Sequence, residues 1–219
     1  MLFSDRDEAG RLLADKVREK IEKADIDKEN LIILAIPRGG IPVAYQVAKA
    51  LNIPFSLVIT KKIALPSDPE AAIGAIAPDG TYLLSGYAKY LSDKEIQIAK
   101  ENALKEAIEK KQKYLKHEVD IKGKDVIIID DGIATGYTAM VAGMYAKNKG
   151  AKRVILAVPV CPANNREKVK KVFDDFICAE PIDTPFFAVG AYYRDFHQVS
   201  DEEVREYEEK AKKEGLFLG

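Results

Sequence analysis

The sequence predicts an α/β fold: an open, mainly parallel β-sheet with helices on both faces. Two observations carry this prediction. Short apolar runs rich in Ile and Val are typical of strands buried on both faces, and helical patterns separate most of these runs. Strands that alternate with helices imply right-handed crossovers, and a sheet of this kind binds ligands in the loops at the carboxyl ends of its strands. The expected strands are Leu31 to Ile36, Phe55 to Thr60, Asp125 to Asp130, Arg153 to Val160 and Phe173 to Ala179.

Helices are expected wherever apolar residues recur at every third or fourth position. The first helix is expected to begin at Ser4, with Asp7 placed like the third residue of a capping box. A Lys- and Glu-rich stretch from about Ser92 to His117 has the helical period, so it is expected to be a long helix with a solvated charged face, whose role the sequence does not indicate. The apolar side of the first helix comprises Leu12, Leu13, Val17 and Ile21, and further helices are expected over 41–51, 137–149 and 164–171.

Length and charge limit the class of protein. The chain of 219 residues is long enough for one large domain whose core needs neither disulfides nor metal ions. Lys and Arg number 34 against 35 Asp and Glu, so the net charge of −1 creates no overall field for a nucleic acid or an anionic membrane. No apolar segment approaches the ~20 residues that span a bilayer, which predicts a cytoplasmic protein without nucleic-acid or membrane partners. A charged fraction of 32% without Trp is typical of thermophile proteins.

The cysteines and histidines do not form a recognisable metal site. Cys161 and Cys178 lie in apolar surroundings without a CxxC spacing, so we expect two small core residues in a reducing compartment rather than a disulfide framework or a zinc site. His117 and His197 have no HExxH motif or Cys/His cluster beside them, so both are expected on the surface or in loops.

The loop after the third apolar run carries the most informative motif. Two adjacent carboxylates, Asp130 and Asp131, leave a strand, and the small residues of the next segment then open a helix at Tyr137-Thr138. Carboxylates accept hydrogen bonds from a vicinal diol, whereas the amides from Ala134 to Thr138, the Thr hydroxyls and the helix dipole can enclose a phosphate. The alternative is an ordinary turn between strand and helix. Neither the Gly-Lys-Ser/Thr of a P-loop nor GxGxxG is present.

A second loop ends the first strand with Pro37-Arg38-Gly39-Gly40, and Ile41-Pro42 then starts a helix. Bare backbone amides and a guanidinium can converge there on an anion. Taken alone, the loop also fits a glycine-rich turn with a solvated Arg.

A third basic segment follows the second strand. Lys61 and Lys62 bring two ammonium groups to the strand end, and the chain then enters a loop that continues through Ser67-Asp68-Pro69-Glu70. The alternative is a solvated lysine pair. Residues 70–77 and 80–85 are expected to form a hairpin around Asp79-Gly80.

These three loops resemble those of the type I phosphoribosyltransferases, from about Leu31 to Glu180. The resemblance implies that Asp130, Asp131 and Lys62 are catalytic and that the two acids bind Mg²⁺. Tyr137 stands where the family often has a second glycine, so its side chain must point away from the phosphate or lie across the site. The implied site for phosphoribosyl pyrophosphate (PRPP) comprises Arg38, Gly39, Gly40, Lys61, Lys62, Asp130, Asp131, Ala134, Thr135, Gly136, Tyr137 and Thr138.

The resemblance implies a Mg²⁺-dependent enzyme of nucleotide metabolism that transfers the 5-phosphoribosyl group from PRPP to a nitrogenous, nucleobase-like acceptor and releases pyrophosphate. Arg38, Lys61 and Lys62 would supply fixed positive charge, and the acids would orient the diol and stabilise a cation-like sugar. The alternatives are a PRPP-binding regulatory protein that performs no transfer and, with less support, a phosphohydrolase. A homodimer is plausible because family members often pair.

The acceptor half of the site is expected in a hood. Ala134 stands where 6-oxopurine enzymes of the family usually have an Asp, which disfavours hypoxanthine and guanine. We expect residues 1–219 to form a single domain with a core of about 25–181, a Rossmann-like sheet, and a small hood of about 182–219 to which the N-terminal helix can contribute. The aromatic residues Phe186, Phe187, Tyr192, Tyr193 and Phe196 either stack on an acceptor or form a small core under a C-terminal helix capped by Ser200 and Glu203.

Overall fold

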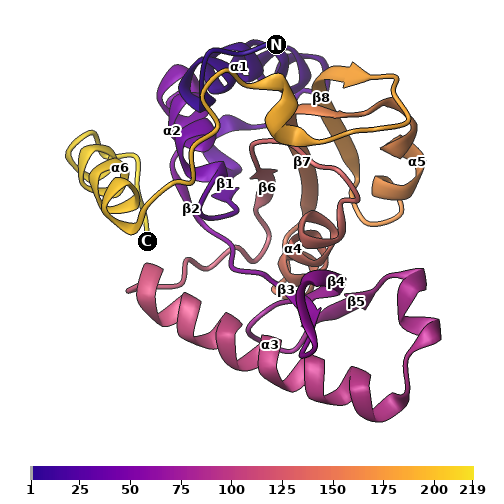
Figure 1. The fold of residues 1–219 in the computed structure, drawn as a ribbon. Coiled ribbons are helices and arrows are strands. Elements are labelled where there is room, and N and C mark those ends of the chain that lie inside the picture. Colours follow the sequence, from indigo (N-terminus) through magenta and orange to yellow (C-terminus); the bar gives the residue numbers. More distant parts are fainter. Residues whose placement is uncertain (1) are drawn as a thin grey trace.

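The computed structural model describes residues 2–219 and has a five-stranded parallel sheet at its centre (Figure 1). Its strand order is β2–β1–β6–β7–β8. Ala35 at the end of β1 pairs with both Leu57 of β2 and Ile129 of β6, so the carboxyl ends of three strands meet at one edge. The predicted α/β fold class is confirmed. The strands are β1 (Leu31–Ala35), β2 (Phe55–Leu57), β6 (Asp125–Ile129), β7 (Arg153–Pro162) and β8 (Asp175–Ile182).

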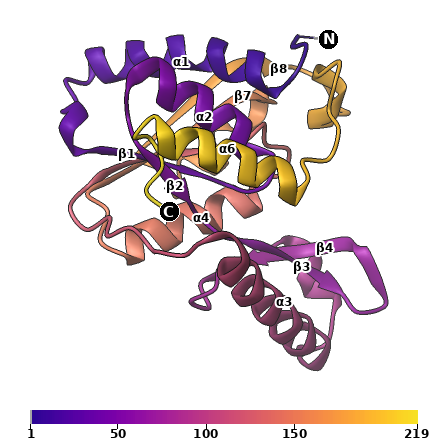
Figure 2. The ribbon, with the colours of Figure 1, turned by 90° about the vertical axis from the view of Figure 1, so that its left-hand side faces the viewer.

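Helices cover both faces of this sheet, as Figure 2 shows. Successive residues of a strand point to opposite faces, so Ile127 and Ile129 pack in the core beneath α1 and α2, whereas Val126 and Ile128 pack in the core beneath α4. The helix α6 packs on the same side as α2. The bounds are α1 (Arg6–Lys23), α2 (Gly40–Leu51), α4 (Tyr137–Asn148), α5 (Arg166–Val169) and α6 (Asp201–Lys213), with 3-10 turns η1 (Lys28–Asn30), η3 (Ala163–Asn165) and η4 (Val189–Tyr192).

Several predicted helix boundaries differ from the structure, most notably at α1 and α5. The cap of α1 is Asp5, one residue later than expected, because its carboxylate accepts a hydrogen bond from the Glu8 amide at 2.8 Å. On that helix Leu12 is 47% exposed, since only the stripe of Leu13, Val17 and Ile21 faces the sheet. The helix expected over 164–171 is confined to η3 and the short α5.

A second, three-stranded antiparallel sheet acts as a small hood, and it comes from the middle of the chain. It contains β3 (Lys61–Leu65), β4 (Asp68–Ile76) and β5 (Tyr82–Leu84), followed by the turn η2 (Gly86–Tyr90) and the helix α3 (Asp93–Tyr114). One face packs on Ala99 and Ala103 of α3, and the other packs against the core beside α4. The hairpin expected around Asp79-Gly80 is confirmed, whereas the loop expected after Lys62 is the strand β3.

The long helix expected over about 92–117 is confirmed as α3, with its capping box formed by Ser92 and Glu95. The stripe that it buries is narrow and consists of Ala99, Ala103 and Ala107. The small side chains of Ala99 and Ala103 pack against the hood sheet, which lies beside part of this long helix (Figure 1).

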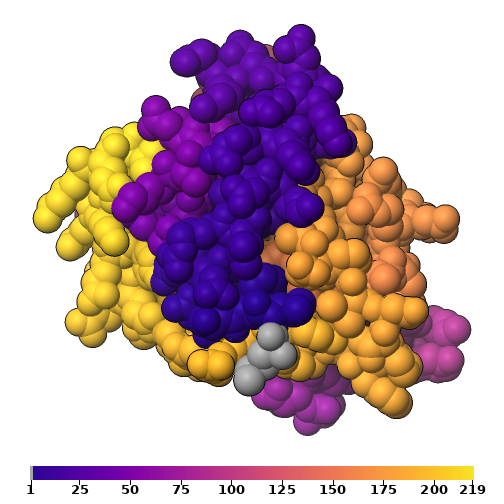
Figure 3. Space-filling view, turned by 90° about the horizontal axis from the view of Figure 1, so that it is seen from above, coloured from indigo at the N-terminus to yellow at the C-terminus, as the bar shows by residue number. Residues whose placement is uncertain are grey.

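Both chain ends return to the main sheet. Phe3 forms a β-bridge with Tyr193, and at the other end Phe217 bridges to Phe55 at the edge of β2. Figure 3 shows α1 as a band with residues of the C-terminal segment beside it. The C-terminal segment, in which the sequence analysis places the hood, thus lies along the main sheet, with Ser200 and Glu203 forming the predicted capping box of α6.

The prediction for the cysteines is wrong: Cys161 and Cys178 form a disulfide between the neighbouring strands β7 and β8. Their Cα atoms are 6.3 Å apart, within the range that a disulfide spans. The sequence contained no sign of this pairing because two parallel strands bring together residues that are 17 positions apart without any local motif. None of the helices within residues 2–219 combines the length and the apolar composition that crossing a bilayer requires.

Candidate functional site

The loops that follow β1, β2 and β6 enclose a cavity of about 280 Å³. Four of the residues that the sequence analysis selects line this cavity: Lys61, Lys62, Asp130 and Thr138. The carboxyl ends of adjacent parallel strands meet at one edge, which is the physical reason these distant residues gather. The remaining lining residues are Ile36, Pro37, Thr60 and Lys110.

Asp130 is the acid that faces the cavity. Its Oδ1 accepts a hydrogen bond from the amide of Asp131 at 2.8 Å. Burial and the neighbouring charge of Asp131 raise the pKa of Asp130 well above its ordinary value, while Lys110 acts in the opposite direction. The charged form of a carboxylate in these surroundings is stabilised most by a ligand that supplies positive charge or hydroxyl donors.

Asp131 has different surroundings, because protein groups already contact one of its carboxylate oxygens and its backbone oxygen. The guanidinium of Arg6 lies 3.0 Å from its Oδ2, and the Tyr193 hydroxyl donates to its backbone oxygen at 2.6 Å. Arg6 is itself held by the carbonyl of His197 at 2.6 Å and by the Phe196 ring, whose centre is 4.2 Å away. Burial raises the pKa of Asp131, and Arg6 lowers it.

Sequence analysis missed Arg6 and the role of Tyr193. One local signal was present in the sequence, because Arg6 opens α1 at the end of the helix where the dipole favours acidic side chains. A cation at that position, which the structure shows to be buried, indicates a tertiary partner. The partner itself lies 125 residues away and has no signature in the chain.

The loop after β1 packs directly on the acids. A Cβ atom added at Gly39 would overlap Oδ2 of Asp131, so this close approach requires glycine. The peptide bond between Pro37 and Arg38 is cis. The Arg38 guanidinium is turned toward α6, 3.6 Å from Asp201, and lines a neighbouring hollow of about 440 Å³ rather than the cavity of Asp130.

The loop from Ala134 to Thr138 has the form that the sequence predicts for anion binding. Gly136 caps α4 with a φ of 85°, a left-handed conformation that glycine adopts without strain. Asn165 donates to the carbonyl of Ala134, and Lys168 donates to that of Thr135 at 2.7 Å. Since N–H and C=O point in opposite directions across a trans peptide, the next amides face away from these side chains, beside the free N-terminus of α4.

The structure decides between the two positions that the sequence allowed for Tyr137. Its ring lies 4.1 Å from the Lys168 ammonium and packs against the core beside α4. The ring is therefore on the carbonyl side of the loop, and the amide side stays open.

Three lysines surround the cavity in different ways. Lys62 is exposed, and Lys61 lies 3.6 Å from Glu106 of α3. Lys110, which the sequence analysis did not select, is partly buried and donates to the carbonyl oxygens of Thr60 at 3.2 Å and Pro37 at 3.4 Å. Burial and then the nearby Lys61 together lower the pKa of Lys110 to about 8.

The aromatic residues expected at the acceptor side mostly form a small core, one of the two alternatives from the sequence. Tyr193 packs on Phe3, and Phe187 stacks on Tyr192 with ring centres 5.2 Å apart. This core lies at the start of α1 and not under α6. Phe186 is 88% exposed.

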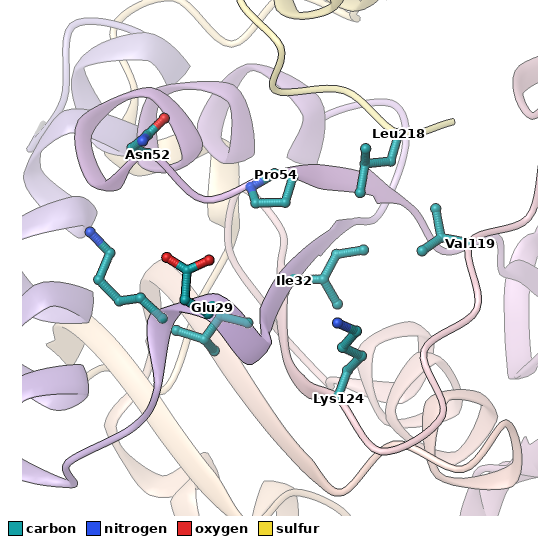
Figure 4. Close-up of a pocket in the computed structure, with 9 residues that line it drawn as sticks. Glu29, Ile32, Asn52, Pro54, Val119, Lys124 and Leu218 are labelled. Atoms are coloured by element: carbon teal, nitrogen blue, oxygen red, sulfur yellow. The ribbon is translucent and has the colours of Figure 1, made fainter.

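The other hollows and side-chain clusters contain fewer groups that could bind a ligand. A hollow of about 380 Å³ lies at the amino ends of β1 and β6, with Asn52, Pro54, Lys124 and Leu218 around it (Figure 4), and it includes no residue that the sequence selects. Within residues 2–219, no group of three or more His, Cys, Asp or Glu side chains is arranged to hold a metal ion. His197 is a surface residue, as predicted, between Asp195 and Glu203.

The chain is similar to a protein family and to several known proteins. A family model described as the phosphoribosyl transferase domain matches residues 6–195. A Mycobacterium tuberculosis (strain H37Rv) protein provisionally named a phosphoribosyl transferase is 35% identical over 225 residues, which cover 100% of this chain and 49% of that protein. The chain thus spans about half the length of the curated relatives it matches. The ribose-phosphate pyrophosphokinase of Thermococcus kodakarensis is 34% identical over 70 residues, covering 31% of this chain and 25% of that protein.

Among solved structures, the protein TT1426 from Thermus thermophilus is similar over almost the whole chain. The TM-score is 0.75 at 31% identity, and the alignment covers 94% of this chain and 97% of that one.

Proposed function

Since the chain belongs to the phosphoribosyl transferase family, we propose that it transfers the 5-phosphoribosyl group of PRPP to a nitrogenous, nucleobase-like acceptor and releases pyrophosphate. The observation that carries the proposal is the single cavity in which Asp130, Thr138 and the lysines after β2 meet. A carboxylate, a helix N-terminus and ammonium groups match the diol, the 5′-phosphate and the pyrophosphate of PRPP.

The 5′-phosphate is proposed to bind the open side of the loop from Ala134 to Thr138. The amides of Thr135 and Gly136 face this side, and the Thr138 hydroxyl lines the cavity. The N-terminus of α4 adds favourable dipole charge. This arrangement fixes one end of the substrate.

Asp130 is proposed to accept hydrogen bonds from the ribose hydroxyls and to stabilise the sugar as it becomes cation-like. Its carboxylate is poorly solvated and close to a second acid, so developing positive charge beside it is favoured electrostatically. Asp131, held by Arg6, orients the pair. Lys61 and Lys62, at the start of the hood, are proposed to stabilise the departing pyrophosphate, with Lys62 as the catalytic lysine. Arg38 lines the neighbouring hollow, and we propose that its side chain turns to reach the pyrophosphate.

A Mg²⁺ ion fits this donor set. Mg²⁺ usually binds to one or two carboxylates together with substrate phosphates, and the structure provides one cavity-facing carboxylate, Asp130, next to a second acid. When bound, the ion would neutralise pyrophosphate charge as it leaves. Arg6 contacts only Oδ2 of Asp131, so Oδ1 is the oxygen through which Asp131 would contribute to the ion.

The acceptor is proposed to bind on the Asp131 side, where the N-terminal residues and the segment around η4 lie. Ala134 cannot supply the carboxylate expected for 6-oxopurines, so we propose an acceptor other than hypoxanthine or guanine. We also propose that residues 1–219 act as one domain, with a core of about 25–181, in the cytoplasm and as a homodimer.

Calorimetry with PRPP and Mg²⁺, followed by a screen for pyrophosphate release over nucleobases and other aromatic nitrogen acceptors, tests the function. We expect PRPP to bind and at least one acceptor to release pyrophosphate. No binding of PRPP would contradict the proposal. Gel filtration tests the dimer separately.

A second candidate is a PRPP-binding regulatory protein that performs no transfer. The occupied state of Asp131 and the packed aromatic residues favour it, because they leave little open room on the acceptor side. Binding of PRPP without release for any acceptor would support this candidate over the enzyme.

A further inference from the structure

We propose that Lys110 is a diphosphate-binding residue, which makes α3 an element of the active site. The inference rests on the proposed function, because the diphosphate concerned is the pyrophosphate group of PRPP. None of the three loop motifs contains Lys110, and it comes from the helix whose role the sequence does not indicate.

The position of Lys110 is the first argument. It is the residue of α3 that lines both the cavity of Asp130 and the adjoining hollow of Arg38. The helix α3 lies beside the hood strands, as Figure 2 shows, and its buried alanines Ala99 and Ala103 pack on that sheet. The C-terminal half of α3 thereby brings a cation to the edge of the main sheet.

The orientation of the ammonium group is the second argument. An ammonium has three donors. Two are directed by the backbone oxygens of Thr60 and Pro37, which belong to the loops after β2 and β1. The third remains for a ligand in the cavity that these loops enclose. Two carbonyl contacts also hold the long side chain in place before binding, which lowers the entropy cost of using it.

The balance of charge is the third argument. Three of the neighbouring cations have carboxylate partners: Glu106 for Lys61, and Asp201 for Arg38 and Lys113. Lys62 and Lys110 belong to none of the ion pairs within residues 2–219, but Lys62 is exposed to solvent whereas Lys110 is partly buried and is influenced by the charge of Asp130. Buried charges in proteins are ordinarily paired, so this cation is suited to an anion that enters from outside.

The competing explanation is purely structural: Lys110 joins α3 to two loops and binds nothing. The two explanations differ in whether the positive charge of Lys110 is required. A structural donor can be replaced by an uncharged one, whereas a diphosphate ligand requires the positive charge. Lys110→Gln keeps an N–H donor and removes the charge, and Lys110→Arg keeps the charge. Lys105→Gln, on the exposed side of the same helix, is the matched control.

The experiment is calorimetric titration of the full chain with inorganic pyrophosphate and, separately, with ribose 5-phosphate. We expect Lys110→Gln to weaken pyrophosphate binding by about 10- to 100-fold, the size of one lost charge-assisted contact, and to leave ribose 5-phosphate binding unchanged. Lys110→Arg should retain most of the affinity, and Lys105→Gln should match the wild type. Thermal melting verifies that each variant is folded.

Equal pyrophosphate affinity in the wild type and Lys110→Gln would overturn the inference, as would a wild type that does not bind pyrophosphate. An equal loss of both ligands in Lys110→Gln would also overturn it, because it would indicate general damage. If pyrophosphate binding depends on Lys110 while no acceptor yields product, the proposed transfer fails and this inference stands. If transfer occurs and Lys110→Gln binds pyrophosphate as tightly as the wild type, the proposed transfer stands and this inference fails.

Discussion

The two acids that end β6 are neighbours in the chain but have opposite surroundings. Asp130 faces an open cavity whose other charged groups are lysines, whereas Asp131 is covered by Arg6, Tyr193 and Phe196. One peptide bond therefore separates a side that lacks a partner from a side that the protein has already filled. The difference teaches that adjacent residues of one motif can have separate roles. Asp130 faces the cavity proposed for PRPP, which is the ligand side, and Asp131 is held by the fold, which is the fold side, next to the position proposed for the acceptor.

The physical cause is the direction in which each side chain leaves the strand end. Asp130 points into the cavity between the loops after β1 and β2, whereas Asp131 lies against Gly39 and Arg6, on the side where Phe3 pairs with Tyr193. Each of the following variants tests whether this division between a ligand side and a fold side holds.

The largest effect is expected for Asp130→Asn. Pyrophosphate release should fall by about 100- to 1000-fold, because an electrostatic group aimed at the cation-like sugar is lost. Stability should not fall. The pKa of Asp130 is raised, so its contribution to stability is fully present only below its unfolded pKa of about 4 and is lost as pH rises through the folded value. A melting series from about pH 5 to pH 8 should therefore show a smaller decline for the variant than for the wild type.

Asp131→Asn is the matched control for that experiment. It leaves the buried Arg6 without its carboxylate, so its melting temperature should drop. If both variants change stability in the same direction, the division between the two acids is wrong.

Arg6→Met should lower the free energy of unfolding by about 2–4 kcal/mol, since it leaves Asp131 charged, largely buried and unpaired. Urea denaturation measures this loss. The double variant Arg6→Met/Asp131→Asn should recover part of it, because neither charge then remains. Affinity for pyrophosphate should change little in the single variant, and a selective loss of that affinity with normal stability would place Arg6 on the ligand side.

Gly39→Ala tests the contact between the first loop and the covered acid. The added Cβ overlaps Oδ2 of Asp131, so the loop or the carboxylate must move, at a cost of about 1–3 kcal/mol in unfolding free energy. The affinity for PRPP, which calorimetry measures, should fall as well. Gly86→Ala is the control, because nothing lies within 4 Å of its added Cβ. A Gly39→Ala protein as stable as this control would contradict the close packing.

The smallest effect is expected at His197, at the outer edge of the covered side. Glu203 and then Asp195 raise the pKa of its imidazole, so the ion pairs are fully present below the unfolded pKa of about 6.5 and are lost as pH rises through the folded value. His197→Gln should remove this pH dependence from the melting temperature. Because the ring is largely exposed, the change should stay below about 1 kcal/mol. If the melting temperatures of the wild type and His197→Gln depend on pH in the same way, this prediction is wrong.

Much of the fold was predictable because its signals are local. Strands buried on both faces appear as continuous apolar runs, and caps such as Ser92 with Glu95 act within three residues. The loop from Asp130 to Thr138 was predictable for the same reason, since its acids, glycine and threonines are consecutive. The hood sheet was only partly predicted: β4 and β5 form the hairpin around Asp79-Gly80, whereas β3 and the helix that covers it depend on packing between separate segments.

The sequence by itself determined the order of strands and helices and the motif that ends β6, because hydrophobic period, caps and glycines operate within a few residues. The tertiary structure alone decided which groups meet that motif. Arg6 reaches Asp131 across 125 positions, Lys110 reaches the carbonyl of Pro37 across 73, and Cys161 joins Cys178 across two strands. Such contacts follow from how whole elements pack, and no pattern along the chain encodes them singly. Charge and burial at the two acids were therefore set by distant segments, although the acids themselves were visible in the sequence.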